Sequence, residues 1–193
     1  LQILAPRFDS GRGLQPSRHE KAKRRGEAAG MNVDYQAQRV KMVDGQLRTT
    51  DVTGHALLQA FLDVPRELFV PESKRDLAYL DADIEIAPGR FLGEASPIAK
   101  LMALAEISSA DAVLNIGAGT GYDAAVLSKL ASKVVALECD SALAEKTEEN
   151  LRAAGASSVS VAVGALEAGV AAGSEACTRR GALPQPGRSG DAG

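Results

Sequence analysis

The chain has 193 residues, of which 45% are hydrophobic, and its formal net charge is -3. This length suits one α/β domain with appendages, and the small net charge argues against a chain that binds nucleic acid over its whole surface. No apolar run approaches the roughly 18 residues that a membrane helix needs, so neither a nucleic acid nor a membrane is expected as a partner.

The cysteine content further limits the class of protein and the kinds of site to expect. Only Cys139 and Cys177 are present. Two cysteines make neither a disulfide framework nor a metal-ligand cluster, so no metal site is expected. A reduced, cytoplasmic setting is the default interpretation of this composition.

Residues 1–30 differ in character from the rest of the chain. They carry seven Lys or Arg against three Asp or Glu, a net charge of +4, and the segment starts with Leu1. An Arg-rich transit peptide and a basic nucleic-acid-binding arm are the alternatives. The segment has no apolar face, and the preferred interpretation is a disordered extension upstream of a translation start at Met31.

Residues 31–110 are predicted to form a helical N-terminal cap region. Apolar residues at helical spacing predict one helix over residues 35–47 and another over residues 51–62. Asp51 is a good N-cap for the second helix. Pro65 is expected to end it, because the residue before a proline avoids the helical region.

The stretch from Asp111 to Leu130 organises the chain. Residues 112–116 form a short apolar run with the length of a buried strand, a glycine turn follows at 117–121, and residues 124–130 have the composition of a helix. Glycines at such a turn let the backbone bend tightly and approach a ligand, because no Cβ intervenes.

A second buried strand is predicted at residues 134–137, and it ends in Glu138. This carboxylate lies 21 residues after Gly117, about where nucleotide-binding folds place the acid that holds a ribose. A third strand is predicted at residues 159–163. Helices between successive strands require crossover connections, so the strands are expected to be parallel.

The spacing of the glycines distinguishes a dinucleotide site from other cofactor sites. A dinucleotide site uses G-x-G-x-x-G, whereas this loop reads G-x-G-x-G. Together with the preceding strand and the following acid, it resembles motif I of the S-adenosylmethionine-dependent methyltransferases. The resemblance implies a doubly wound, Rossmann-like α/β core, of which residues 111–173 supply the first three strands. It also implies S-adenosyl-L-methionine as cofactor, held by Gly117, Ala118, Gly119, Gly121, Tyr122 and Glu138.

Further segments narrow the resemblance to one family. They read Met42-Val43 with Gln46-Leu47-Arg48, Val64-Pro65-Arg66-Glu67 with Phe69-Val70-Pro71-Glu72, and Ala78-Tyr79 with Asp81. With the loop at 117–122, they are similar to the protein-L-isoaspartate O-methyltransferases, over about residues 31–169. The resemblance implies methylation of the α-carboxyl of isoaspartyl residues in damaged proteins. Two alternatives stay open, namely a methyltransferase with another, small acceptor and a noncatalytic protein that keeps a degenerate cofactor fold.

The chain departs from the family pattern at two places. The family reads Thr-Ile-Ser-x-Pro before the next helix, and alignment on Pro97 puts Ala95 at the serine position with Ser96 adjacent. Ser96 and Pro97 are predicted to be the N-cap and first residue of that helix, so the catalytic residue is unassigned. The family reads Gly-Asp-Gly after the third strand, where this chain has Ala165. Both departures indicate a divergent member and leave open a methyl acceptor other than isoaspartate. The missing hydroxyl at Ala95 predicts low isoaspartyl activity.

After Gly169 the sequence shows neither strand nor helix periodicity. Residues 174–193 are predicted to be a disordered tail unlike the family, in place of its fourth strand. Without that strand the first strand of the sheet keeps a free edge. The chain is therefore expected to be marginally stable and a poor or inactive enzyme by itself.

Overall fold

A computed structural model of the chain describes residues 33–169. The predictions for residues 1–30 and for the tail at 174–193 therefore lie outside the described residues. Residues 34–169 belong to one compact unit. Within it, α2 (Tyr35–Met42) is capped by Asp34, whose carboxylate accepts the Ala37 N–H at 2.9 Å.

The first predicted helix is confirmed, although its second half is not regular α-helix. It continues as a π-helical turn (Val43–Leu47) and a 3-10 turn (Arg48–Thr50). The prediction that Asp51 caps the next helix is wrong. Asp51 adopts a left-handed conformation with φ of 66° and ends the 3-10 turn instead.

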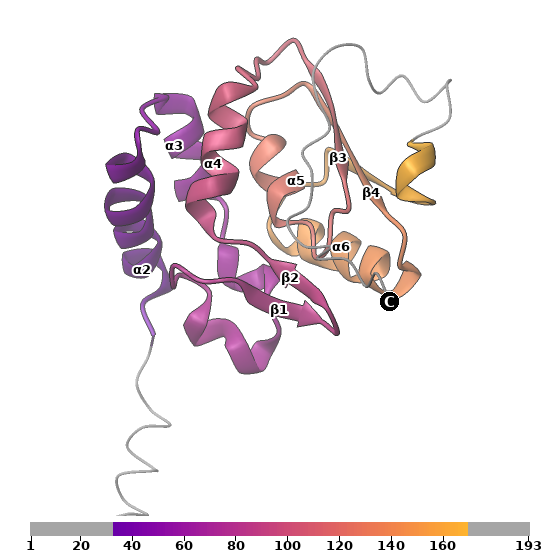
Figure 1. Cartoon of the computed structure of the whole chain (residues 1–193), viewed down its shortest axis with the longest axis horizontal. Coiled ribbons are helices and arrows are strands. Elements are labelled where there is room, and N and C mark those ends of the chain that lie inside the picture. The colour runs from indigo at the N-terminus through magenta and orange to yellow at the C-terminus, as the bar shows by residue number, and fades with distance from the viewer. Residues whose placement is uncertain (1–32, 170–193) are drawn as a thin grey trace, which may run out of the picture. The chain divides into compact units, whose positions relative to one another are not determined.

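Helix α3 (His55–Asp63) starts after Gly54. It ends as predicted, because Val64 before Pro65 is extended with φ of −90° and ψ of 118°. Two 3-10 segments follow, Arg66–Phe69 and Glu72–Leu77. Helices α2 and α3 lie together with α4 on one side of the unit (Figure 1).

The cap region also contains a hairpin that the helical prediction did not include. Strands β1 (Ile84–Ala87) and β2 (Arg90–Leu92) pair antiparallel across a turn in which Gly89 has φ of 68°. Helix α4 (Ala95–Leu104) follows directly and leads into the sheet.

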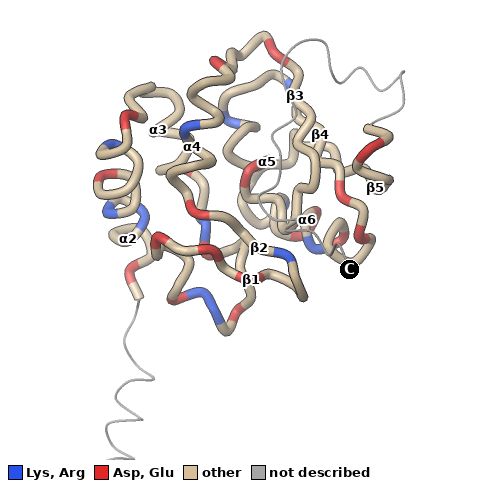
Figure 2. The backbone as a smooth tube through the Cα atoms, in the orientation of Figure 1, with Lys and Arg blue, Asp and Glu red and all other residues tan. Residues whose placement is uncertain are grey.

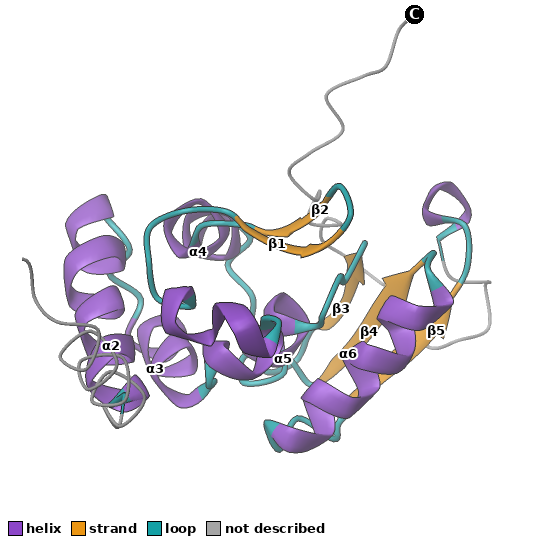
Figure 3. Ribbon diagram, turned by 90° about the horizontal axis from the view of Figure 1, so that it is seen from below, coloured by secondary structure: helices purple, strands orange, loops and turns teal. Residues whose placement is uncertain are grey.

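The sheet itself is parallel, as predicted. Its strands are β3 (Ala112–Ile116), β4 (Lys133–Glu138) and β5 (Val159–Val163), in the order β3-β4-β5. Two helices make the crossovers, α5 (Tyr122–Leu127) and α6 (Ser141–Ala153). Figure 3 shows α6 lying across β4 and β5. This α/β arrangement with a parallel sheet is the fold class that the sequence predicted.

Strands β3 and β4 are buried on both faces, which explains their nearly continuous apolar sequences, whereas β5 has no fully buried residue. Alternate residues point to opposite faces. The main core takes Val113, Val134 and Ala136, and a smaller second cluster contains Leu114, Val135 and Leu137. Helix α5 packs into the main core, where Ala124, Ala125, Val126 and Leu127 are all fully buried.

Polar contacts hold the cap region together and tie it to the loop after β3. The Arg66 side chain is fully buried, and its guanidinium donates to the carbonyl oxygens of Ala78 at 2.7 Å and Gly93 at 2.6 Å. The Thr120 hydroxyl, in the loop after β3, donates to the Phe69 carbonyl at 2.6 Å. The cap region therefore helps to fix the loop in which the candidate site lies.

Charges of both signs are spread over the described residues, as Figure 2 shows. Acidic and basic side chains alternate on the outer face of α6, for example Glu145, Lys146 and Arg152. Within residues 33–169, no helix is both long and apolar enough to cross a membrane.

Candidate functional site

The glycine loop lies at the carboxyl end of β3 and leads into α5. Gly117, Gly119 and Gly121 all have positive φ, at 73°, 60° and 93°. Such values favour glycine, because a Cβ would strain the backbone there. The loop also folds back over the neighbouring strand, since the N–H groups of Gly117 and Ala118 donate to the Leu137 carbonyl at 2.7 and 3.0 Å.

Glu138 meets this loop at the end of β4. Because β3 and β4 are adjacent and parallel, their carboxyl ends lie at the same edge of the sheet. The Glu138 side chain is fully buried, and its Oε2 accepts the Gly119 N–H at 2.8 Å. Its Oε1 accepts the N–H groups of Cys139 at 2.9 Å and Asp140 at 3.1 Å. The structure thus brings the two predicted parts of the cofactor site into direct contact.

Arg90 completes the surroundings of this carboxylate. Its Nη1 lies 2.9 Å from Glu138 Oε1 and its Nη2 lies 2.7 Å from Oε2, a two-pronged ion pair. Burial acts to raise the pKa of Glu138, but the Arg90 guanidinium and the backbone N–H groups of Asp140 and Gly119 outweigh it and lower that pKa to about 2. Glu138 is therefore ionised at every physiological pH.

Sequence reasoning missed Arg90, which lies 48 residues from Glu138. It follows the turn residue Gly89 and begins β2, and a single arginine beside a hairpin turn is ordinarily a solvated surface residue. No spacing in the sequence connects the hairpin turn to the end of β4, so only the tertiary structure reveals the contact.

Two polar residues of α6 also hold the glycine loop and were missed. The Thr147 hydroxyl donates to the Gly119 carbonyl at 2.7 Å, and the Asn150 amide donates to the Thr120 carbonyl at 3.0 Å. Both side chains are buried on the same helix face as Leu143 and Leu151. Thr147 and Asn150 could have been recognised in the sequence, because they are polar residues on an otherwise apolar helix face.

Tyr122 and Ala118 are two further residues that were predicted to hold the cofactor, and their surroundings differ. The Tyr122 ring is fully buried, with edge contacts to Phe61 and Phe69 at centroid distances of 6.2 and 5.6 Å. The Arg66 guanidinium lies 4.7 Å from the centre of the same ring. Tyr122 therefore anchors the loop in the core through its side chain. Ala118 is buried, and its carbonyl accepts the Gly121 N–H at 2.8 Å.

The structure corrects the prediction for Ser96. Glu94 is the N-cap of α4, and Ala95 is the first helical residue, so Ser96 and Pro97 lie inside the first turn. Glu94 is extended with ψ of 146°, and the helix therefore begins two residues earlier than predicted. The Ser96 hydroxyl donates to Thr50 Oγ1 at 3.0 Å, which links α4 to the cap region.

Ala95, at the position of the family serine, is buried with 1% of its surface exposed. Its methyl group packs in the main core with Ile98 and Met102. Ala95 has no polar side-chain group, and the Ser96 hydroxyl already bonds Thr50. Neither side chain offers a free group for catalysis, so the catalytic residue stays unassigned.

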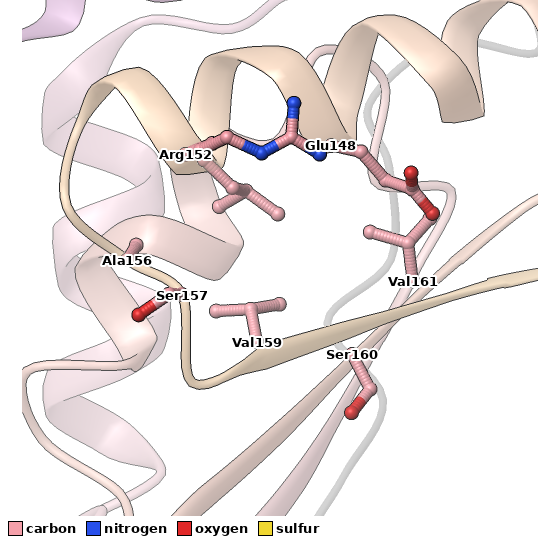
Figure 4. A pocket seen from close by; sticks show the side chains of 8 residues that line it. Glu148, Arg152, Ala156, Ser157, Val159, Ser160 and Val161 are labelled. Carbon is pink, nitrogen blue, oxygen red and sulfur yellow. The ribbon is translucent and has the colours of Figure 1, made fainter.

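A hollow of about 380 Å³ lies elsewhere, between α6 and β5. Figure 4 shows Val159 and Val161 of β5 pointing toward α6, along which Glu148 and Arg152 extend. Its lining includes no residue of the glycine loop. Among residues 33–169 there is also no group of three or more His, Cys, Asp or Glu side chains that could hold a metal ion.

Comparison with known proteins agrees with this arrangement. The model of the protein-L-isoaspartate(D-aspartate) O-methyltransferase family matches residues 37–175. The chain belongs to this family. A protein-L-isoaspartate O-methyltransferase of Methanoculleus marisnigri is 38% identical over 127 residues, which are 66% of this chain and 58% of the relative. One of Rhodopseudomonas palustris is 38% identical over 130 residues, 67% of this chain and 53% of the relative.

Solved structures of the same family share the fold. One protein-L-isoaspartate O-methyltransferase superposes with a TM-score of 0.59 at 27% identity, over 68% of this chain and 44% of that chain. A Plasmodium falciparum protein described as a putative member, in complex with S-adenosyl-L-homocysteine, gives a TM-score of 0.55 at 15% identity, over 68% of this chain and 63% of that chain. The chain spans little more than half the length of the curated relatives.

The second departure from the isoaspartate methyltransferase pattern lies two strands away from the glycine loop. Ala165 follows β5 in an extended conformation and leads into a 3-10 turn (Leu166–Ala168). The Gly164 N–H donates to the Glu138 carbonyl at 3.0 Å, so this segment borders the same edge of the sheet. At Ala165 only backbone groups can form hydrogen bonds.

Proposed function

We propose that this chain carries the cofactor-binding half of an S-adenosylmethionine-dependent protein-L-isoaspartate O-methyltransferase. The observation that carries the proposal is the contact between Glu138 and the Gly119 N–H, 2.8 Å apart at one edge of a parallel sheet. In open α/β sheets, ligands bind outside the carboxyl ends of the strands. A buried carboxylate beside a glycine loop at that edge has the chemistry of a site for a ribose.

The residues present fit the cofactor in their chemistry. Glu138 stays ionised, and its two oxygens are acceptors of the kind that the two hydroxyl groups of a ribose require. The positive φ angles of Gly117, Gly119 and Gly121 shape the loop, and the missing Cβ atoms allow close approach of a ligand. Thr147 and Asn150 hold the loop in place by bonding its carbonyl oxygens.

When bound, S-adenosylmethionine supplies a methyl group on a sulfonium, which is a good leaving group. The work of the protein is then mainly to align the acceptor with that methyl group. This explains how the chain could take part in methyl transfer without a visible acid–base pair. The names of the relatives and the sequence resemblance support an isoaspartyl α-carboxyl as the acceptor.

We expect low turnover on that acceptor. Ala95 has no hydroxyl where the family pattern has serine, and the Ser96 hydroxyl is bonded to Thr50. The test is incorporation of labelled methyl from S-adenosylmethionine into an isoaspartyl peptide, with the same peptide containing ordinary aspartate as control. Label should enter only the isoaspartyl peptide, slowly, and the Ala95→Ser variant should be faster.

Other outcomes separate the alternatives. Turnover at an ordinary enzyme rate, with no gain from Ala95→Ser, would contradict the role given to Ala95. Cofactor binding without label in either peptide would favour another acceptor. No cofactor binding at all would favour a noncatalytic protein. We also propose a cytoplasmic setting, which the low cysteine content supports; cell fractionation would test it.

A further inference from the structure

The carboxylate of Glu138 has no capacity left in this structure. Oε1 accepts from Arg90 Nη1, from the N–H groups of Cys139 and Asp140 and, at 3.4 Å, from the Cys139 thiol. Oε2 accepts from Arg90 Nη2 and the Gly119 N–H. Two oxygens with about four lone-pair sites already receive five nitrogen donors. Two ribose hydroxyls cannot be added unless existing donors leave.

The donors differ in how easily they can leave. The three backbone N–H groups belong to the glycine loop and to the turn between β4 and α6, so their positions follow from the fold. The Arg90 side chain is 26% exposed, whereas the Glu138 side chain is fully buried. The Cys139 thiol is the other side-chain donor, but it contacts Oε1 alone. The guanidinium bonds both oxygens and can withdraw to water without unfolding either turn.

The hairpin that carries Arg90 also contacts the loop directly. A Cβ built on Gly119 would lie 3.0 Å from Ile86 Cδ1 of β1. At its outer side the hairpin is held by Lys74, whose ammonium lies 3.5 Å from Glu85 Oε2 and donates to the Glu85 carbonyl at 2.9 Å. The hairpin therefore lies against the glycine loop, and Arg90 bonds the Glu138 carboxylate beside that loop.

We propose that Arg90 and the vicinal hydroxyls of a ribose are mutually exclusive partners of Glu138, so that Arg90 sets the affinity for the cofactor. This inference rests on the proposed cofactor site. A guanidinium and a vicinal diol each present two donors side by side to the same pair of oxygens. The ligand class is a nucleoside with both ribose hydroxyls, and its binding releases Arg90 from the carboxylate.

The test is calorimetric binding of S-adenosylhomocysteine, which lacks the positive charge of the sulfonium. Arg90→Gln removes the competing ion pair and should tighten binding on the order of tenfold. Lys74→Gln is the matched control, because it removes a cation that bonds the same hairpin but not Glu138. It should leave the affinity unchanged. In a Glu138→Gln background, Arg90→Gln should give no gain, since the two residues act on one contact.

Several results would overturn the inference. If the unaltered protein binds and Arg90→Gln leaves the affinity unchanged or weakens it, Arg90 does not compete. An equal gain from Lys74→Gln would assign the effect to a looser hairpin. If every variant fails to bind, the proposed cofactor site itself is wrong. Should Arg90→Gln not fold, Arg90→Lys keeps the charge but loses the two-pronged geometry, and a gain of a fewfold is then expected.

Discussion

Asp123, in the first turn of α5, is an acid whose surroundings disfavour its ionised form. Its Oδ1 is buried and has no hydrogen-bond partner among residues 33–169. Burial raises the pKa of Asp123 from 3.8 to about 6, and the charge of Arg66 only partly offsets this. Because the pKa is higher in the folded state, stability falls as pH rises from about 4 to 6 and stays lower above that range.

We therefore expect the Asp123→Asn variant to be more stable than the unaltered protein at pH 8, by about 1–3 kcal/mol. Near pH 4 the aspartate is protonated and neutral in the folded state, so the advantage should disappear. Urea unfolding at both pH values measures the difference. A stability difference of the same size at both values would show that the effect does not come from ionisation.

At the scale of elements, α6 packs tightly against the glycine loop. A Cβ on Gly121 would lie 2.8 Å from Thr147 Cγ2 and 3.4 Å from Leu151 Cγ, and the φ of Gly121 is 93°. By contrast, Gly155 has φ of 69° but nothing within 4 Å of a built Cβ. The two positions share a positive φ and differ in available space.

Alanine substitutions at Gly121 and Gly155 therefore form a matched pair of variants. Gly121→Ala should lower the free energy of unfolding by about 2–4 kcal/mol, the sum of backbone strain and overpacking. Gly155→Ala should lower it by only about 1 kcal/mol, from backbone strain alone. Urea unfolding of both proteins measures this, and equal losses would mean that α6 yields to the added methyl group.

Local patterns in the sequence were enough to predict the strand–loop–helix–strand unit. The strands at 112–116 and 159–163 coincide with β3 and β5, because short apolar runs between glycine turns and helices have few other stable arrangements. Residues within one such unit also determine where the loop and Glu138 meet.

Features that depend on the tertiary structure were not predicted. Asp51 and Ser96 have good capping side chains, yet the surrounding chain makes the first a left-handed turn residue and bonds the second to Thr50. Arg90 reaches Glu138 only because the hairpin lies against the glycine loop. These contacts join segments that are distant in sequence, and propensity carries no information about them.

On the scale of the whole molecule, the parallel sheet places the candidate site at its carboxyl edge. The cap region, its hairpin and α6 all contact the glycine loop there, through Phe69, Ile86 and Thr147. Within the described residues, β3 pairs with β4 alone. The expectation that the chain is marginally stable by itself stays a prediction. The contact between the Gly119 N–H and Glu138 is made within the described residues.

The central claim is that Glu138 and the glycine loop together bind the ribose of the cofactor. Its most direct test is calorimetric titration of the chain with S-adenosylhomocysteine, comparing Glu138→Ala with Glu145→Ala, which removes an exposed acid from the outer face of α6. Two charge-assisted hydrogen bonds to the ribose should outweigh the partly exposed ion pair with Arg90. We predict that Glu138→Ala weakens binding on the order of tenfold or more and that Glu145→Ala leaves it unchanged. Equal affinity of the unaltered protein and Glu138→Ala would contradict the claim.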